Sequence, residues 1–198
     1  MKQLRQEIEK LVSINNQEWS QIESQFTLVS LPKGQIIHQA GEIFRKTYYI
    51  KSGSARAFLI DSQGKDFTWQ LYFRDSSSSG NNHFLDDSVS YYEQQGSFLS
   101  FETLENSLFY VIDNSTLDEL FNSDKKFEKM ARRYLHDNLF SPMYKRTLSI
   151  MSEDAQTRYH RLIKDHPNIF KHVKAYHVAS YLGIAPQTLS KIRKNESR

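Results

Sequence analysis

Six polar side chains with several hydrogen-bond donors lie close together near the carboxyl end of the chain. They are Gln187, Thr188, Ser190, Lys191, Arg193 and Lys194. Amide, hydroxyl, ammonium and guanidinium groups of this kind bond to base edges and to phosphate oxygens. These residues therefore predict contacts with a nucleic acid. An ordinary helical hairpin with a solvated basic face is the alternative, because short motifs produce false positives.

The residues before and among these donors have the spacing of two short helices joined by a tight turn. Contacts between the helices would come from Val178, Leu182, Ile184, Leu189 and Ile192. Ala179 is small where the helices approach closely, and Gly183 suits a turn position with positive φ. Pro186 fits the first turn of the second helix, where its missing N–H costs nothing. Residues 177–194 are therefore predicted to form a helix-turn-helix.

The distribution of charge favours a polyanion as the partner. Residues 1–124 contain 10 Lys and Arg against 17 Asp and Glu, whereas residues 125–198 contain 16 against 6. The net charges are −7 and +10, so only the second part of the chain would attract a polyanion. An anionic membrane surface would attract it too, but here the basic residues accompany a helix-turn-helix pattern. We therefore expect double-stranded DNA, and no membrane, as the partner.

Other residues that could perform chemistry lack the partners that catalysis or metal binding requires. Asp86 and Asp87 are adjacent, and neighbours in a strand point to opposite faces, so a solvated loop is the simpler interpretation. His38 and His83 lack the His-x-His spacing of a metal site. The chain contains no cysteine, which excludes disulfides and cysteine-ligated clusters. We expect no enzymatic activity, no catalytic residue, no metal and no cofactor.

The amino terminus indicates where the protein resides. Its charged residues are scattered and no apolar signal-peptide core is present. No stretch of the sequence approaches the length of a membrane span. We therefore expect a cytoplasmic protein.

The first part of the chain is predicted to be helical and then rich in strands. Apolar residues recur at helix spacing through the first 26 residues. Short apolar runs separated by glycine turns follow, with the clearest strands at 47–53, 54–61 and 66–73 and two more within 97–113. This pattern predicts an antiparallel barrel or jelly roll. The polar segment 74–96 is expected to be a functional loop or lid.

Helices are predicted after Asn114. A long helix from Ser123 would have an apolar stripe that could pack on the barrel or against a second copy of the chain. The stripe consists of Phe127, Met130, Ala131, Tyr134, Leu135 and Leu139. Pro142 should kink this helix or end it. Further helices are expected at 154–164 and near 169–173, before the helix-turn-helix.

The order of these elements resembles the CRP/FNR family of bacterial transcription regulators over nearly the whole chain. In the barrel the resemblance depends on the glycine turns of LPKGQIIHQAGE (31–42) and YYIKSGSARAFLIDSQGKD (48–66). Near the carboxyl end it depends on RYHRLIKDHPNIF (158–170) and VASYLGIAPQTLSKIRK (178–194), which are similar to members from Bacteroidetes-type bacteria.

The resemblance implies an α+β protein in three parts. These are a cyclic-nucleotide-binding-like, antiparallel β-barrel or jelly-roll sensor domain (1–122), a long dimerisation helix (123–150) and an all-α helix-turn-helix domain (151–198). It also implies a homodimer with two recognition helices in successive major grooves, and RNA polymerase as a further partner. Gln187, Lys191 and Arg193 match residues directed at DNA, with Thr188 and Ser190 near phosphates.

The effector site departs from the family's nucleotide-binding pattern. Cyclic-nucleotide binders have a Phe-Gly-Glu turn for the ribose and an Arg for the phosphate. This chain has FLDD at 84–87, with Leu85 in place of Gly, and QQGSFLSF at 94–101 contains no cation. We do not expect cAMP to bind in the usual way, and a different small-molecule effector is left open. The corresponding pocket residues are Phe84, Asp86, Ser97, Phe98 and Ser100.

A second class of function is compatible with the same residues. The chain could be a small-molecule- or metal-binding β-barrel whose helical tail serves only for assembly. Stoichiometric metal or turnover would favour that class, and sequence-specific DNA binding would favour a regulator.

Overall fold

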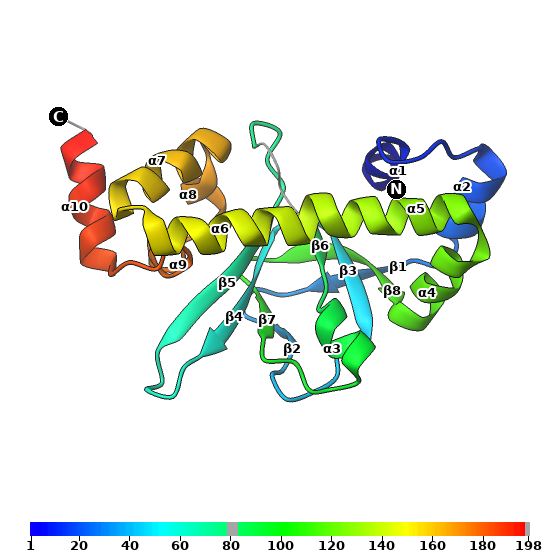
Figure 1. Ribbon diagram of the computed structural model, residues 1–198, viewed down its shortest axis with the longest axis horizontal. Coiled ribbons are helices and arrows are strands. Elements are labelled where there is room, and N and C mark those ends of the chain that lie inside the picture. Colours follow the sequence, from blue (N-terminus) through cyan, green and yellow to red (C-terminus); the bar gives the residue numbers. More distant parts are fainter. Residues whose placement is uncertain (79–82, 197–198) are drawn as a thin grey trace.

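The computed structural model describes residues 1–78 and 83–196. A β-sandwich lies beneath one long helical rod (Figure 1). Two short helices, α1 (Lys2–Glu9) and α2 (Asn16–Glu23), precede the strands. A capping box starts α2, in which the Asn15 side chain accepts from the Glu18 N–H and the Glu18 carboxylate accepts from the Asn15 N–H. The helical amino terminus predicted from apolar spacing is confirmed.

The described residues include eight strands in two antiparallel sheets, with the orders β1-β8-β3-β6 and β2-β7-β4-β5. The strands are β1 (Thr27–Leu31), β2 (Ile36–His38), β3 (Lys46–Ser52), β4 (Ser54–Ile60), β5 (Asp66–Phe73), β6 (Phe84–Leu85), β7 (Ser100–Thr103) and β8 (Ser107–Asp113). The five strands predicted most clearly from the sequence are all present. The predicted α+β class with antiparallel sheets is confirmed.

The segment 74–96 is more regular than its composition predicts. It contains the two-residue strand β6 and the helix α3 (Ser88–Glu93), and residues 79–82 lie outside the described residues. Asp87 starts α3, because its carboxylate accepts from the Ser90 N–H at 3.1 Å. The prediction of an irregular loop is therefore wrong for the part between Phe84 and Glu93.

Aromatic side chains fill the space between the two sheets. The Phe44 and Phe101 ring centroids are 4.7 Å apart, and Leu85 is fully buried among them. Gly53 connects β3 to β4 with a φ of 94°, and a Cβ there would lie 2.2 Å from Ser107 Oγ. Glycine is required at this position both by its backbone conformation and by the close approach of β8.

The rod consists of three segments that continue one another. After α4 (Asn114–Ser123) they are α5 (Lys125–Tyr134), the π-helical segment η1 (Leu135–Phe140) and α6 (Ser141–Ser152). Proline removes one N–H and crowds the carbonyl four residues earlier. The wide turns of η1 come directly before Pro142 and accommodate both effects. The prediction that Pro142 ends the helix is wrong, because α6 continues beyond it to Ser152 and the rod runs on through it (Figure 1).

The rod has one buried and one exposed apolar surface. Phe127 and Met130 pack against α1 and α2 in one core cluster, and Ala131 is also buried, so the first part of the predicted stripe covers the molecule itself. A second set of apolar side chains, here called the rod stripe, is exposed further along. It consists of Phe140, Met143, Tyr144, Leu148 and Met151.

Four helices end the described chain at the far end of the rod (Figure 1). They are α7 (Ala155–Asp165), α8 (Ile169–His172), α9 (Ala175–Leu182) and α10 (Pro186–Glu196). Their core also includes Leu71 and Phe73 of β5, so this helical domain is docked on the sandwich. Within the described chain, every helix is too short or too polar to cross a bilayer.

Candidate nucleic-acid interface and effector region

The predicted helix-turn-helix is present as α9 and α10. Val178, Ala179 and Leu182 of α9 are buried, and Leu189 of α10 is only 1% exposed. Gly183 ends α9 in the left-handed conformation with a φ of 67°, and its N–H bonds to the Ser180 carbonyl at 3.0 Å. The turn and the buried residues have the arrangement that the sequence predicts.

The opposite side of α10 is polar and exposed. All six predicted DNA-contacting residues are exposed to solvent, namely Gln187, Thr188, Ser190, Lys191, Arg193 and Lys194. Gln187, Lys191 and Lys194 are four and three residues apart, so they share one helix face. This face is directed away from the Leu189 contacts, and here it is called the α10 face.

Arg193 has a different environment from the other five. Its guanidinium carbon lies 4.0 Å from the centroid of the Phe170 ring, which belongs to α8. A stacked guanidinium of this kind is attracted by the ring and is held in place. The structure therefore places Arg193 against α8, outside the α10 face.

Polar contacts attach the helix-turn-helix domain to β5. Ser180 Oγ accepts from the Thr68 N–H at 2.8 Å. Arg146 of α6 joins all three parts, because it donates to the carbonyls of Trp69 (2.8 Å), Thr68 (3.2 Å) and Tyr181 (2.7 Å). Burial lowers the pKa of Arg146, and the carbonyl oxygens compensate for the lost water. We call this arrangement the Arg146 junction.

The five predicted effector-pocket residues are not brought together. Ser97 is buried, and its hydroxyl bonds to Asp87 and to the Leu99 carbonyl. Ser100 Oγ accepts from the Ala40 N–H at 3.0 Å, and Phe98 is 86% exposed. These hydroxyl groups bond within the loops that connect the strands. Only Phe84 and Asp86 line a common cavity.

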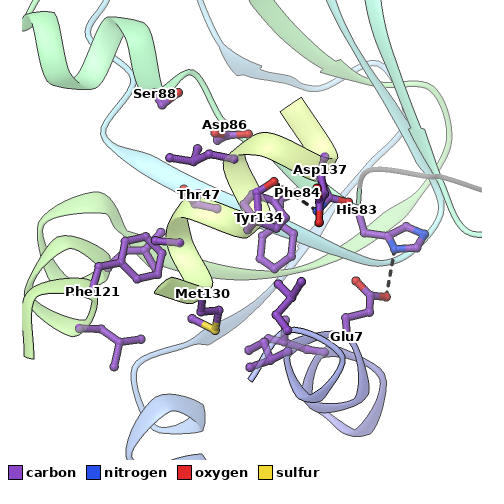
Figure 2. Close-up of a pocket in the computed structure, with 18 of the residues that line it drawn as sticks. Glu7, Thr47, His83, Phe84, Asp86, Ser88, Phe121, Met130, Tyr134 and Asp137 are labelled. Atoms are coloured by element: carbon purple, nitrogen blue, oxygen red, sulfur yellow. Dashed lines mark hydrogen bonds and ion pairs between the residues drawn. The ribbon is translucent and has the colours of Figure 1, made fainter. Parts of the chain in front are cut away.

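That cavity lies outside the sandwich core, between the β3–β6 side of one sheet and the helices α1, α4 and α5. It has a volume of about 480 Å³. Figure 2 shows Glu7 of α1, Asp86 after β6 and Met130 of α5 around it. Sequence reasoning found the contribution of β6 but missed the helices, because no local pattern indicates that α1 approaches α5.

Asp86 is the most perturbed carboxyl group at the cavity. Its Oδ1 is buried and has no hydrogen-bond partner within the described part of the chain. Burial raises the pKa of Asp86 to about 7, with a further contribution from the neighbouring Asp87 carboxylate. The solvated loop predicted for this acidic pair is therefore wrong for Asp86.

Glu7 lies at the edge of the same cavity and has three partners. Its Oε1 accepts from the Tyr49 hydroxyl at 2.9 Å and from Arg74 at 2.7 Å, and lies 3.0 Å from His83 Nδ1 (Figure 2). Burial alone would raise the pKa of Glu7, but His83, Tyr49 and Arg74 together lower it. This cluster ties α1 to β3 and to the end of β5, and the sequence analysis did not identify it.

The two histidines considered as metal ligands, His38 and His83, have other contacts. His38 Nε2 lies 3.1 Å from the Glu42 carbonyl oxygen, and His83 pairs with Glu7. Among the residues that the structure describes, no three His, Cys, Asp or Glu side chains are grouped to hold a metal ion.

Known proteins resemble this chain in structure. FixK2 from Bradyrhizobium japonicum superimposes with a TM-score of 0.68 at 14% identity, over 86% of this chain and 83% of FixK2. CLP from Xanthomonas campestris, a c-di-GMP-responsive global regulator, matches with a TM-score of 0.63 at 13% identity, over 90% of each chain. A Eubacterium rectale protein assigned to the crp/fnr family of transcriptional regulators matches with a TM-score of 0.63 at 14% identity, over 92% of this chain and 83% of that protein.

By sequence, no protein-family model and no curated protein matches the chain. The structural matches extend over the sandwich, the rod and the helix-turn-helix domain alike. The chain therefore has the fold of the CRP/FNR-type transcription regulators.

Proposed function

We propose that this protein is a homodimeric regulator of transcription that binds specific sequences of double-stranded DNA. The observation that carries the proposal is the α10 face, which exposes Gln187, Lys191 and Lys194 while Leu189 anchors the helix. Such a helix fits the major groove, where amide and ammonium groups read base edges. The basic carboxyl-terminal part of the chain adds attraction to phosphates.

The rod stripe supports the dimer. Met151 is 79% exposed, and the Phe140 and Tyr144 rings stack with centroids 6.1 Å apart. A contiguous apolar surface of this kind is typical of a protein interface. In such a dimer we expect the two α10 helices to lie about 34 Å apart, because half-sites one turn of DNA apart require this spacing.

The sandwich serves as the sensor domain in this proposal, with RNA polymerase as the partner through which bound dimers act. The Arg146 junction provides the connection, because it contacts β5, the rod and α9 at once. A change in the sandwich that moves β5 would shift the helix-turn-helix domain. In this role the protein has no catalytic activity, and its neighbours in structure include regulators such as CLP.

The proposed sensor does not bind cAMP in the usual way. A phosphate would require a cation near Ser97, yet a Cβ at Gly96 would lie 2.4 Å from the Gly41 carbonyl oxygen, so an Arg has no room there. Arg56 of β4 is buried but is already paired with Asp66 and Glu102.

Selection of binding sites from random duplexes tests the proposal, followed by anisotropy titrations on the selected site. Lys191→Ala should weaken binding about tenfold or more, and a phosphate contact would also reduce the salt slope by about one. Lys33→Ala is the matched control, since it removes the same charge from an exposed position of the sensor domain. Failure to enrich any palindrome, together with salt-independent retention, would refute DNA recognition.

A further inference from the structure

We propose that the cavity between α1, α4, α5 and β6 binds a small organic cation with an apolar body, with the Asp86 carboxylate as its counter-ion. One part of this inference rests on the proposed function, namely that such an amine would act as the effector of the regulator. The binding itself depends on the geometry of the cavity alone.

The walls of the cavity favour an apolar body. Leu4 and Ile8 of α1, Phe121 of α4 and Met130 of α5 line it, and the Phe84 and Tyr134 ring centroids are 5.0 Å apart at one side (Figure 2). Its volume of about 480 Å³ is that of a small-molecule site. Aromatic rings at the walls also attract cations through their faces.

The charges at the cavity favour a cation over an anion. The described lining residues include five acids, Glu7, Asp75, Asp86, Asp118 and Asp137, against two basic side chains, Lys10 and His83. His83 is already paired with Glu7. A cyclic nucleotide or another phosphate would meet a negative field here, whereas an ammonium group would be attracted.

Among the described residues, Asp86 differs from the other four acids because its buried Oδ1 has no hydrogen-bond partner. Glu7 accepts from Tyr49 and Arg74, Asp118 accepts from the Tyr92 hydroxyl at 2.6 Å, and Asp75 accepts from Ser77. Asp137 lies 2.8 Å from His136 Nδ1.

For Asp86, by contrast, Oδ1 is buried without any hydrogen bond from the described residues. A buried carboxylate without a donor is costly, and a bound ammonium group would supply both the donor and the charge. The raised pKa of Asp86 agrees with a carboxyl group that lacks this counter-charge.

Three ligands that share one body test the proposal by calorimetry on the full chain without DNA. They are 2-phenylethylamine, 2-phenylethanol and phenylacetate, used at about pH 8, where Asp86 is ionised and the amine is protonated. We expect the amine to bind at least tenfold more tightly than the alcohol, and phenylacetate to bind more weakly than either. Equal binding of amine and alcohol, preference for phenylacetate, or no amine binding at millimolar concentration would overturn the proposal.

Two variants locate the site. Asp86→Asn should weaken amine binding at least tenfold and leave binding of the alcohol unchanged, because only the charge is removed. Asp118→Asn is the matched control at the same cavity, and it should change amine affinity less than threefold, since Asp118 is already paired with Tyr92. An unchanged amine affinity in Asp86→Asn would overturn the proposal.

The ligand comparison on the wild-type chain stands even if the Asp86 variant folds poorly. Because no DNA is present, failure of DNA binding would leave the result intact. Amine binding that has no effect on DNA affinity would remove the effector role alone.

Discussion

Replacing Arg146 by alanine should loosen the helix-turn-helix domain from the rest of the protein. The guanidinium makes three hydrogen bonds to main-chain carbonyls on β5 and α9, and its carbon lies 4.2 Å from the centroid of the Tyr181 ring. Hydrogen bonds from charged groups contribute about 1.5–3 kcal/mol each, and the ring contact adds about 0.5–2 kcal/mol. In the alanine variant, water can hydrate the carbonyl groups that the arginine contacted, which offsets part of this sum.

We therefore expect Arg146→Ala to lower the free energy of unfolding by about 2–4 kcal/mol. Urea denaturation monitored by fluorescence measures the loss. The chain has two tryptophans, Trp19 and Trp69, so a Trp19→Phe background leaves Trp69 as the only reporter. Its carbonyl is part of the Arg146 junction and its ring centroid lies 5.7 Å from the Arg146 guanidinium, so undocking should change its emission before global unfolding.

Arg146→Lys separates charge from geometry, because one ammonium group cannot reach three carbonyls in a fork arrangement. It should therefore lose most of the same stability. Arg133→Ala is the matched control, since Arg133 is an exposed arginine on the same rod. Its effect should stay within about 0.5 kcal/mol. An Arg146→Ala midpoint equal to that of Arg133→Ala, with unchanged Trp69 emission, would show that the junction does not hold the domains together.

Three further predictions concern the rod, the turn and the cavity. Leu148→Glu in the rod stripe should convert the proposed dimer to a folded monomer in sedimentation velocity, and a dimer that persists would contradict the proposed interface. Gly183→Ala should lower the free energy of unfolding by about 1 kcal/mol, since a Cβ there meets no atom within 4 Å but the φ of 67° is strained; an unchanged melting temperature would count against this conformation. Asp86 has a pKa of about 7 in the folded protein and 3.8 as a free group, so the folded protein binds this proton more tightly than the unfolded chain. The free energy of unfolding should therefore fall by up to about 4 kcal/mol from pH 4 to pH 7. The Asp86→Asn variant should lose that part of the pH dependence, and an identical slope in both proteins would show that Asp86 is not buried as described.

Local patterns in the sequence were sufficient for the helix-turn-helix and for the main strands. The turn at Gly183, the proline that starts α10 and the buried Leu189 depend on neighbours within a few residues, so their spacing predicts them. The same holds for β3, β4 and β5, whose alternating or continuous apolar runs are bounded by turn residues.

Pro142 shows where local rules were insufficient. Its effect on a helix is decided by whether the preceding turns can widen, and the π-helical η1 segment allows the rod to continue. The apolar stripe from Phe127 to Leu139 was likewise divided by tertiary packing. Phe127 and Met130 are covered by α1 and α2, whereas Leu135 of the same stripe is 37% exposed.

The sequence by itself determined the main helices and strands, and which end of the chain is basic, because these properties depend on near neighbours and on composition. Only the tertiary structure decided which distant residues meet. Glu7, Arg74 and His83 converge on one point although they are far apart in the chain, and Arg146 reaches carbonyls on two other elements. The cavity beside Asp86 has the same origin, since its walls come from helices and strands that the fold alone brings together.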